Sequence, residues 1–411
     1  MRKHKSNFLI AILALILMIA GSVVIYTVGP RVAETQGAPS NTYILHHLPM
    51  VVAAIIAMIV MALDWQNIML KFSRKFLGRT IAIPKNEVIW GKFALVLTAI
   101  SAFLCVIIAV LGRLGSSLVD CNLGACRSLN LHGFGFQAVE MFKFCVMFYV
   151  AYLITKNKRE GTFDQAPMWV PIICILVFTG SVICVGQKDF GSTAVIVAMI
   201  TAMLFIAGIS WKHLFILLAA YAVLGFLMII TSEHRRARMS GFAEGSYHLS
   251  NSLIGIGTGG FSGVGLENSV QTVGYLPEAL TDSIFSVICE AFGFFGAMLA
   301  LVAFVVLLWQ ILTVAKQSEN LMMRMVAVAV FAWIFAHVII NIGGMIGVIP
   351  MKGITLSFLS YGGTSLIFTG AAIGTVLYIS EWTKRGKIID EDSSSRRGER
   401  RSRNAGYSRY S

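Results

Sequence analysis

Residues 275–296 read YLPEALTDSIFSVICEAFGFFG, and they pass from a proline-containing turn into an apolar run that continues to about residue 315. Three carboxylates accompany this change: Glu278 and Asp282 stand at the entrance, and Glu290 lies about two turns inside. A run of this length and apolarity is typical of a helix that crosses a membrane. Ionisable side chains are costly there, so these acids are candidates for function.

The rest of the chain repeats this apolar pattern. Of its 411 residues, 57% are hydrophobic and 13% are charged, against about 25% charged residues in a typical soluble protein. The excess is concentrated in runs near the roughly 20 residues that cross a bilayer. The sequence therefore predicts an all-α, polytopic membrane protein with ten spans, at about 8–29, 44–63, 91–112, 136–155, 168–185, 193–209, 213–231, 283–315, 325–345 and 364–382.

Two of these runs differ from a simple span, one in its length and the other in the basic residues before it. The run at 283–315 is longer than a bilayer requires, so we expect it to bend or to project from the membrane. The run at 8–29 follows a basic start, but it lacks an evident small-residue cleavage site and is too long for the apolar core of a signal peptide. We therefore interpret it as a retained anchor.

The distribution of lysine and arginine predicts the orientation, because cytoplasmic loops carry an excess of both. A cytoplasmic N-terminus places inside the tail and Lys71, Arg74, Lys75, Arg79, Lys85, Lys156, Lys158, Arg159, Lys212 and Lys316. It places outside only Arg31, Arg113, Arg127, Lys188, Arg235, Arg236, Arg238 and Lys352. Both termini are thus predicted to be cytoplasmic, and the net charge of +13 indicates topology rather than binding to nucleic acid.

The chain is expected to divide into a membrane domain at 1–383 and a basic, disordered cytoplasmic tail at 384–411. The tail suits an anchor near anionic lipid, with a partner-docking segment as the alternative. Most of the seven cysteines lie inside spans, where they act as small apolar residues. Cys121 and Cys126 lie instead in a predicted outside loop, where either a disulfide or two free thiols is possible.

Three predicted outside segments are rich in glycine: 186–193, 347–365, and the long loop at 232–282 that contains IGIGTGGFSGVGLENS. Residues 255–260 match G-x-G-x-x-G, but no strand precedes them, so a dinucleotide site is rejected. Non-helical backbone at membrane depth is tolerated where protein buries it or where it lines a wet cavity. We expect these segments to share one external cavity. The glycines at 255–265 suit either a flexible re-entrant loop or close approach of the backbone to a ligand, which glycine permits.

The ionisable residues inside spans leave alternatives open. Glu140 and Lys143 are three residues apart and are expected to pair on one helical face, for structure or for function. Glu290 suits either a buried, satisfied acid or a functional one, and His337 suits a helix contact. Asp282 is either the N-cap of its helix or a carboxylate that faces the cavity. About 12 Å of helix rise separates it from Glu290, which is too far for a shared-proton pair.

Several segments, in this order along the chain, resemble the FtsW/RodA/SpoVE (SEDS) family. They are QKDFGST, RRARMSGF, IGIGTGGFSGVGLENSVQ, YLPEALTDSIFSVICEAFGFFG and NIGGMIGVIPMKGITLSFLSYGGTS, over about 185–370. KGITLSFLSYGGTS is more similar to the FtsW division branch than to the RodA elongation branch. The resemblance implies the ten-span fold and an enzyme that polymerises lipid II outside the cytoplasmic membrane.

The resemblance also implies site residues. The aspartate of the family's LPEAxTD motif falls on Asp282, as the catalytic base. Substrate contacts are expected from Gln137, Glu140, Lys143, Arg235, Arg236, Arg238, Glu290, Ser360 and Gly362. The chain departs from the family at GACRSL, where Ser128 replaces a tryptophan, and at Ala138, Val139, Lys188, Leu280 and Ala291. These departures affect the expected shape of the donor site more than the reaction.

The expected chemistry is attack of a sugar hydroxyl on an anomeric carbon with loss of polyprenyl pyrophosphate, which a positioned base assists. The arginines, Lys143, or a Mg²⁺ or Mn²⁺ ion held by the pyrophosphate would neutralise the leaving group; the sequence indicates no resident cofactor. A class B penicillin-binding protein and other division proteins are the partners that the resemblance implies, at the septum. The alternatives are a lipid II flippase, a RodA-type elongation polymerase and a scaffold with a vestigial cavity.

Overall fold

The computed structural model describes residues 6–64, 87–122, 125–131, 134–230, 247–266, 268–269, 275–276, 278–350 and 353–383. Its elements, in chain order, are α1 (Phe8–Thr35), α2 (Thr42–Ala62), α4 (Glu87–Arg113), β1 (Val119–Asn122), β2 (Ala125–Leu131), β3 (Phe134–Phe136), α5 (Ala138–Glu160), α6 (Ala166–Phe178), the π-helix η1 (Thr179–Gly186), α7 (Phe190–Ala207), α8 (Trp211–Ile230), α10 (Tyr247–Gly259), α11 (Ile284–Gln317), α12 (Leu321–Met345) and α13 (Gly363–Ser380). The predicted tail at 384–411 lies outside the described residues.

The helices agree with the predicted spans. Within the described residues, nine stretches are long and apolar enough to cross a membrane, and they coincide with nine of the ten predicted runs. The helices α6 and η1 together form one of them, Ala166–Gly186. The remaining run, at 213–231, coincides with α8, a helix of 20 residues. The predicted polytopic, all-α class is therefore confirmed.

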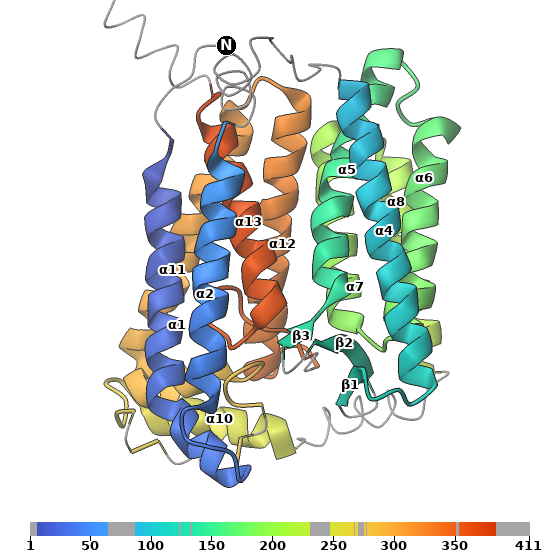
Figure 1. Ribbon diagram of the computed structural model, residues 1–411. Helices are drawn as coiled ribbons and strands as arrows, with labels where there is room; N and C mark the ends of the chain where they lie inside the picture. The colour runs from blue at the N-terminus through green and yellow to red at the C-terminus, as the bar shows by residue number, and fades with distance from the viewer. Residues whose placement is uncertain are drawn as a thin grey trace, which may run out of the picture.

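The spans stand side by side in one bundle (Figure 1). The most buried of them are α5, α12 and α13, which form the centre of the bundle. Around them, α2 packs on α13, α4 packs on α5, and both α7 and α11 pack on α12. Because lipid removes most of the hydrophobic drive between helices, close packing must hold such a bundle together.

The first and last described spans meet at one end of the bundle. The Asn7 backbone N–H donates to Ser380 Oγ at 2.9 Å, and the Asn7 side chain donates to Gln310 Oε1 at 2.9 Å. The Ser6 hydroxyl donates to Glu381 at 2.7 Å. The two ends of the described chain therefore lie on the same side, as the lysine and arginine pattern predicts, although the side of the membrane stays a prediction. The opposite end carries β1–β3 and α10 (Figure 1) and is called the sheet end below.

The small sheet was not predicted. Its strands pair antiparallel in the order β1-β2-β3. They contain four, seven and three residues, which is too short for alternation to distinguish a strand from a loop. Thr364 Oγ1, in the first turn of α13, donates to the Gly135 carbonyl oxygen at 3.0 Å. The sheet is thus tied to the core of the bundle.

The predicted bend of the long run is present in α11. Gly293 leaves the helical conformation with φ 64° and ψ −160°, which a glycine adopts without steric cost. The turn after α10 pairs with the backbone at this break: the Phe294 N–H donates to the Gly260 carbonyl oxygen at 2.9 Å, and the Val264 N–H donates to the Glu290 carbonyl oxygen at 3.0 Å. Groups that a broken membrane helix would leave unpaired are therefore satisfied by protein.

The expectation of a flexible, non-helical loop at 255–265 is wrong for its first half, because residues 255–259 belong to the helix α10. A Cβ at Gly259 would clash with the carbonyl oxygen of Cys289 in α11. This glycine therefore allows close approach of α10 to the backbone of α11, whereas the sequence suggested close approach to a ligand. The residues after α10 then pair with α11 at its break, as described above.

Candidate active site

Asp282 lies at the sheet end, in the turn that leads into α11. The helix begins at Ile284 and its N-cap position belongs to Ser283, so the alternative in which Asp282 caps the helix is wrong. The backbone N–H groups of Thr281 and Ser283 donate to the Glu278 carbonyl oxygen at 3.1 and 3.2 Å and close the turn. Asp282 is left outside the helix and half-buried.

The backbone of this turn is held by residues from α12 and from the loop before α13. Asn341 Nδ2 donates to the carbonyl oxygens of Asp282 and Ile354, each at 2.7 Å. The buried Ser360 hydroxyl donates to the Thr281 carbonyl oxygen. Because these bonds join main chain that is distant in sequence, the position of Asp282 is coupled to the loop between α12 and α13.

The electrostatic surroundings of Asp282 set its pKa. Loss of hydration on burial is the largest of the causes that raise the pKa of Asp282 to about 7. The charge of Glu278 raises this pKa, the charge of Arg127 lowers it, and Asp189 raises it. Desolvation therefore outweighs the opposing charge of Arg127. A carboxyl group with a pKa near neutrality is suited to accept and return a proton at neutral pH.

Three segments meet at the Asp282 carboxylate. A Cβ placed on Gly353 would lie 3.1 Å from Asp282 Oδ2 and 3.2 Å from Arg127 Nη1. Arg127 Nη1 donates to the Gly353 carbonyl oxygen at 3.4 Å, and Nη2 donates to the Lys188 carbonyl oxygen at 3.2 Å. Gly353 also has a positive φ of 63°. A side chain there would therefore be strained and would crowd both charged groups.

The contacts around Asp282 can be compared with the prediction that three glycine-rich segments share one external cavity. Two of the three glycine-rich segments, 186–193 and 347–365, contribute Lys188 and Gly353 to the surroundings of Asp282. The third, 232–282, ends at Asp282 itself, and its residues 259–265 pack against α11, as described above. The grouping of the first two at one end agrees with the expectation, while a cavity shared by all three stays a prediction.

The predicted pair on α5 is formed inside the bundle. Lys143 Nζ lies 2.8 Å from Glu140 Oε1, and both side chains are buried. His337 Nε2 accepts from Trp333 Nε1 at 3.2 Å and lies 3.3 Å from Lys143 Nζ, while Nδ1 lies 3.0 Å from the Thr355 carbonyl oxygen. Since Nε2 accepts, we assign the ring proton to Nδ1. His337 is therefore a helix contact, as expected, and it also reaches the loop before α13.

The other predicted substrate contacts have different surroundings. The Gln137 backbone N–H donates to Thr364 Oγ1 at 3.1 Å, and Gly362 precedes α13 in an extended conformation. Glu290 is buried and accepts from Ser269 Oγ, so its carboxylate connects the turn after α10 to α11. The roles of these residues, of Ser360, and of Glu140 and Lys143 in substrate binding stay predictions. Outside the described residues lie Arg235, Arg236 and Arg238.

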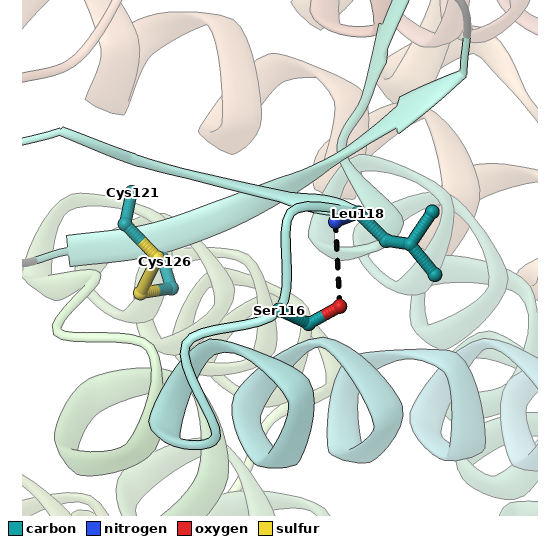
Figure 2. The surroundings of a disulfide bond; sticks show 4 residues. All are labelled: Ser116, Leu118, Cys121 and Cys126. Atoms are coloured by element: carbon teal, nitrogen blue, oxygen red, sulfur yellow. Dashed lines mark hydrogen bonds between the residues drawn. A yellow bond between two sulfur atoms is a disulfide. The ribbon is translucent and has the colours of Figure 1, made fainter.

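Arg127, like Asp189, is a charged residue near Asp282 that was not predicted as part of the site. It follows Cys126, which forms a disulfide with Cys121 across the β1–β2 hairpin (Figure 2). Of the two alternatives for these cysteines, the disulfide is therefore the one present. The arginine of GACRSL, which matches the second arginine of the family's GARRWI-like segment, was the available signal. Its importance depends on contacts with residues 61 and 226 positions away, which the sequence does not show.

A bundle of membrane-length helices that holds a carboxyl group of raised pKa beside an arginine at one end defines a polytopic membrane protein with a candidate acid–base site. The family described as Cell cycle protein, FtsW/RodA/SpoVE, matches residues 7–385. This chain therefore belongs to the FtsW/RodA/SpoVE family.

Individual relatives and solved structures agree with this membership. Probable peptidoglycan glycosyltransferase FtsW of Coxiella burnetii is 33% identical over 321 residues, which cover 75% of this chain and 84% of the relative. Stage V sporulation protein E of Bacillus subtilis is 29% identical over 394 residues, 93% of this chain and 99% of the relative.

Two solved structures share the fold. One is described as "Structural coordination of polymerization and crosslinking by a peptidoglycan synthase complex", with a TM-score of 0.67, 19% identity, and coverage of 91% of this chain and 97% of that chain. The other is the rod shape determining protein RodA of Thermus thermophilus, with a TM-score of 0.60, 20% identity, and coverage of 91% and 96%. At these identities the likeness concerns the fold alone.

Proposed function

We propose that this protein is a peptidoglycan glycosyltransferase that polymerises lipid II on the outer face of the cytoplasmic membrane, with Asp282 as the general base. The relatives named FtsW support the activity. The observation that carries the assignment of the base is the Asp282 carboxyl group, which is half-buried, lies outside its helix and has a pKa raised to about 7. A base is most useful when its pKa lies near the working pH.

The proposed reaction joins two lipid-linked disaccharides. The hydroxyl oxygen of the acceptor sugar forms a bond to the anomeric carbon of the donor, and its proton passes to the Asp282 carboxylate. The bond between the anomeric carbon and the pyrophosphate oxygen breaks, and the polyprenyl pyrophosphate leaves with the electron pair. Direct displacement of this kind inverts the configuration, from α to β. Pyrophosphate needs no general acid, but its charge must be neutralised.

This neutralising charge has two candidate sources, a guanidinium group and a divalent cation. Arg127 lies beside Asp282, and a guanidinium group suits phosphate oxygens. No group of three or more His, Cys, Asp or Glu side chains in the described part of the chain is placed to hold a metal ion. A divalent cation bound mainly by the substrate pyrophosphate stays a prediction, with the oxygens of the substrate as its ligands.

We further propose a role in cell division, with a class B penicillin-binding protein as partner and the septum as location. The FtsW names of several relatives support this branch over the RodA-type elongation role. A peptidoglycan synthase complex that coordinates polymerization and crosslinking has a chain of the same fold, which supports a partner that crosslinks.

The test is glycan-strand synthesis by purified protein in lipid vesicles that contain lipid II, with and without a candidate transpeptidase partner. We expect polymer from the unchanged protein and none from Asp282→Asn, which is nearly isosteric. Glu34→Gln removes a carboxylate from an exposed position at the end of α1 and serves as the matched control. Transfer of the lipid II head group across the vesicle membrane without polymer would favour the flippase and overturn this proposal.

A further inference from the structure

Arg127 stands on a hairpin that a covalent bond closes, and it reaches two loops beside Asp282. From this arrangement we infer that Arg127 is a positioning residue for Asp282 and that the Cys121–Cys126 disulfide holds Arg127 in place. The inference rests on the proposed function, because it assigns how the base of that reaction is kept in position. It does not require that Arg127 touch the substrate.

The hairpin directs its two adjacent residues to opposite sides. Cys121 and Cys126 are direct partners in the β1–β2 register, and successive side chains of a strand point to opposite faces. The Cys126 side chain packs toward the end of α4, where a Cβ on Gly112 would lie 2.9 Å from its sulfur atom. Arg127 therefore points away from α4 and toward the loops that carry Lys188 and Gly353. Fixing Cys126 also fixes the direction of its neighbour.

The guanidinium group connects two loops that are distant from each other in the sequence. Its Nη1 and Nη2 atoms donate to Gly353 and Lys188 at 3.4 and 3.2 Å. Lysine could not reproduce this, because a forked, planar donor is needed to reach two carbonyl oxygens at once. Asn341 then connects the loop of Gly353 to the backbone of Asp282 through Ile354. If Arg127 were displaced, Gly353 would lose its hydrogen bond to the guanidinium group, while the contact of this loop with Asn341 would remain.

The charges around Asp282 make the same residue matter electrostatically. Glu278 from the same turn and Asp189 from the start of α7 both disfavour the charged carboxylate, and Arg127 from β2 is the opposing cation. The loop before α13 contributes the uncharged Gly353, and Lys352 lies outside the described residues. Without Arg127, the pKa of Asp282 rises, so the acid limb of the rate profile moves to higher pH.

The disulfide adds a restraint at the edge of the sheet. β1 contains four residues and is an edge strand that pairs with β2 in the three-stranded sheet. A bond between Cys121 and Cys126 limits the conformations of the segment that carries Arg127. A predicted outside location is also the setting in which a disulfide persists. Opening the disulfide is therefore expected to act on Asp282 through Arg127.

The experiment measures glycan synthesis from lipid II in vesicles across a range of pH. The variants are Arg127→Ala, Arg127→Lys and the double variant Cys121→Ser with Cys126→Ser. The unchanged protein is also measured after treatment with dithiothreitol, which gives two electrons and two protons to the disulfide and becomes its own cyclic disulfide. Arg113→Ala, an exposed arginine at the end of α4, and Cys174→Ser, an exposed free cysteine, are the controls.

We expect synthesis to fall roughly 10- to 100-fold for Arg127→Ala, the cysteine double variant and the reduced protein, as a misplaced reacting group commonly costs. The acid limb moves to higher pH in Arg127→Ala. Arg127→Lys keeps the charge, so its acid limb stays near that of the unchanged protein while its rate falls. The two controls keep the unchanged rate. A merely structural role would lower the rate without moving the acid limb.

Hydrogen–deuterium exchange provides a readout that does not depend on activity. Arg127→Ala and reduction are both expected to raise exchange in the loop 353–362, while α5 and α12 keep their protection. Normal synthesis with an unmoved acid limb in Arg127→Ala would overturn the positioning role, and normal synthesis in the reduced protein would overturn the role of the disulfide. If the unchanged protein makes no polymer, the proposed function fails, and unchanged exchange in the loop would then overturn this inference separately.

Discussion

Asp282 and Glu140 are two carboxylates of the same bundle in opposite situations. Glu140 is buried in α5 and its charge meets Lys143 at 2.8 Å. Asp282 is half-buried at the sheet end, and among the described residues no ion pair joins it to a cation. A fixed partner and an available proton site are different solutions: the first keeps a buried charge paired, and the second leaves a carboxylate able to change its protonation.

The largest expected effect is a loss of glycan synthesis when Asp282 is replaced. Asp282→Asn removes the proposed base and is expected to lower glycan synthesis by about 100- to 10,000-fold, the usual contribution of general base catalysis. The thermal unfolding of the protein in lipid nanodiscs should change little, because Asn341 and Ser360 hold main-chain atoms of this turn. A large loss of stability in this variant would mean that Asp282 has a structural role instead.

The second effect is the converse and concerns stability. Lys143→Met leaves Glu140 buried without its cation, which typically costs about 3–5 kcal/mol when a buried pair is broken. We expect a lower unfolding temperature in nanodiscs, measured by intrinsic fluorescence. Adding Glu140→Gln to Lys143→Met should recover most of the loss, since replacing both partners is often neutral. Unchanged stability in the single variant would contradict the structural role of the pair.

A third change tests the crowding at the sheet end. Gly353→Ala places a methyl group 3.1 Å from Asp282 Oδ2 and 3.2 Å from Arg127 Nη1, at a φ of 63°. The strained backbone costs about 1–3 kcal/mol, and the displaced charged groups should lower synthesis by roughly tenfold. Gly37→Ala, also at a positive φ but with open space around it, is the matched control. Equal rates for the two variants would show that the space beside Asp282 is not used.

The smallest expected effect concerns His337, which contacts both Lys143 and the loop before α13. His337→Gln can still accept from Lys143 and donate toward the Thr355 carbonyl oxygen, so it should lower synthesis only about 2- to 5-fold, which corresponds to about 0.5–1 kcal/mol for one altered hydrogen bond. His337→Leu can do neither and should lower both synthesis and unfolding temperature further. If glutamine and leucine were equally harmful, the histidine contacts described here would not be the reason.

Much of the fold is predictable from local pattern. Apolar runs of bilayer length are visible without any contact information, and this is why the spans were expected. The run that forms α11 is longer than a bilayer requires, and this is why its bend was expected. The pairing of Glu140 with Lys143 was predictable for the same reason, since a spacing of three residues places both on one helical face.

The errors and omissions share a different cause. Residues 255–259 were expected in a loop because glycine is unfavourable in helices, but packing against α11 outweighs this preference at α10. Asp282 was a candidate for the N-cap of α11, but the N-cap is the next residue, Ser283. Arg127 was missed because both of its hydrogen bonds join it to segments distant in sequence. The candidate base was thus predictable, but its surroundings were not.

The most direct test of Asp282 as the general base is the pH dependence of glycan synthesis by the reconstituted protein at lipid II concentrations well below saturation, where the rate reports the pKa values of the free enzyme. A base must be ionised to accept a proton, and the pKa of Asp282 is raised to about 7. The account predicts that synthesis rises as the pH increases through about 7 and that Asp282→Asn makes almost no polymer at any pH. A rate that does not change across this range, or substantial polymer from Asp282→Asn, would contradict it.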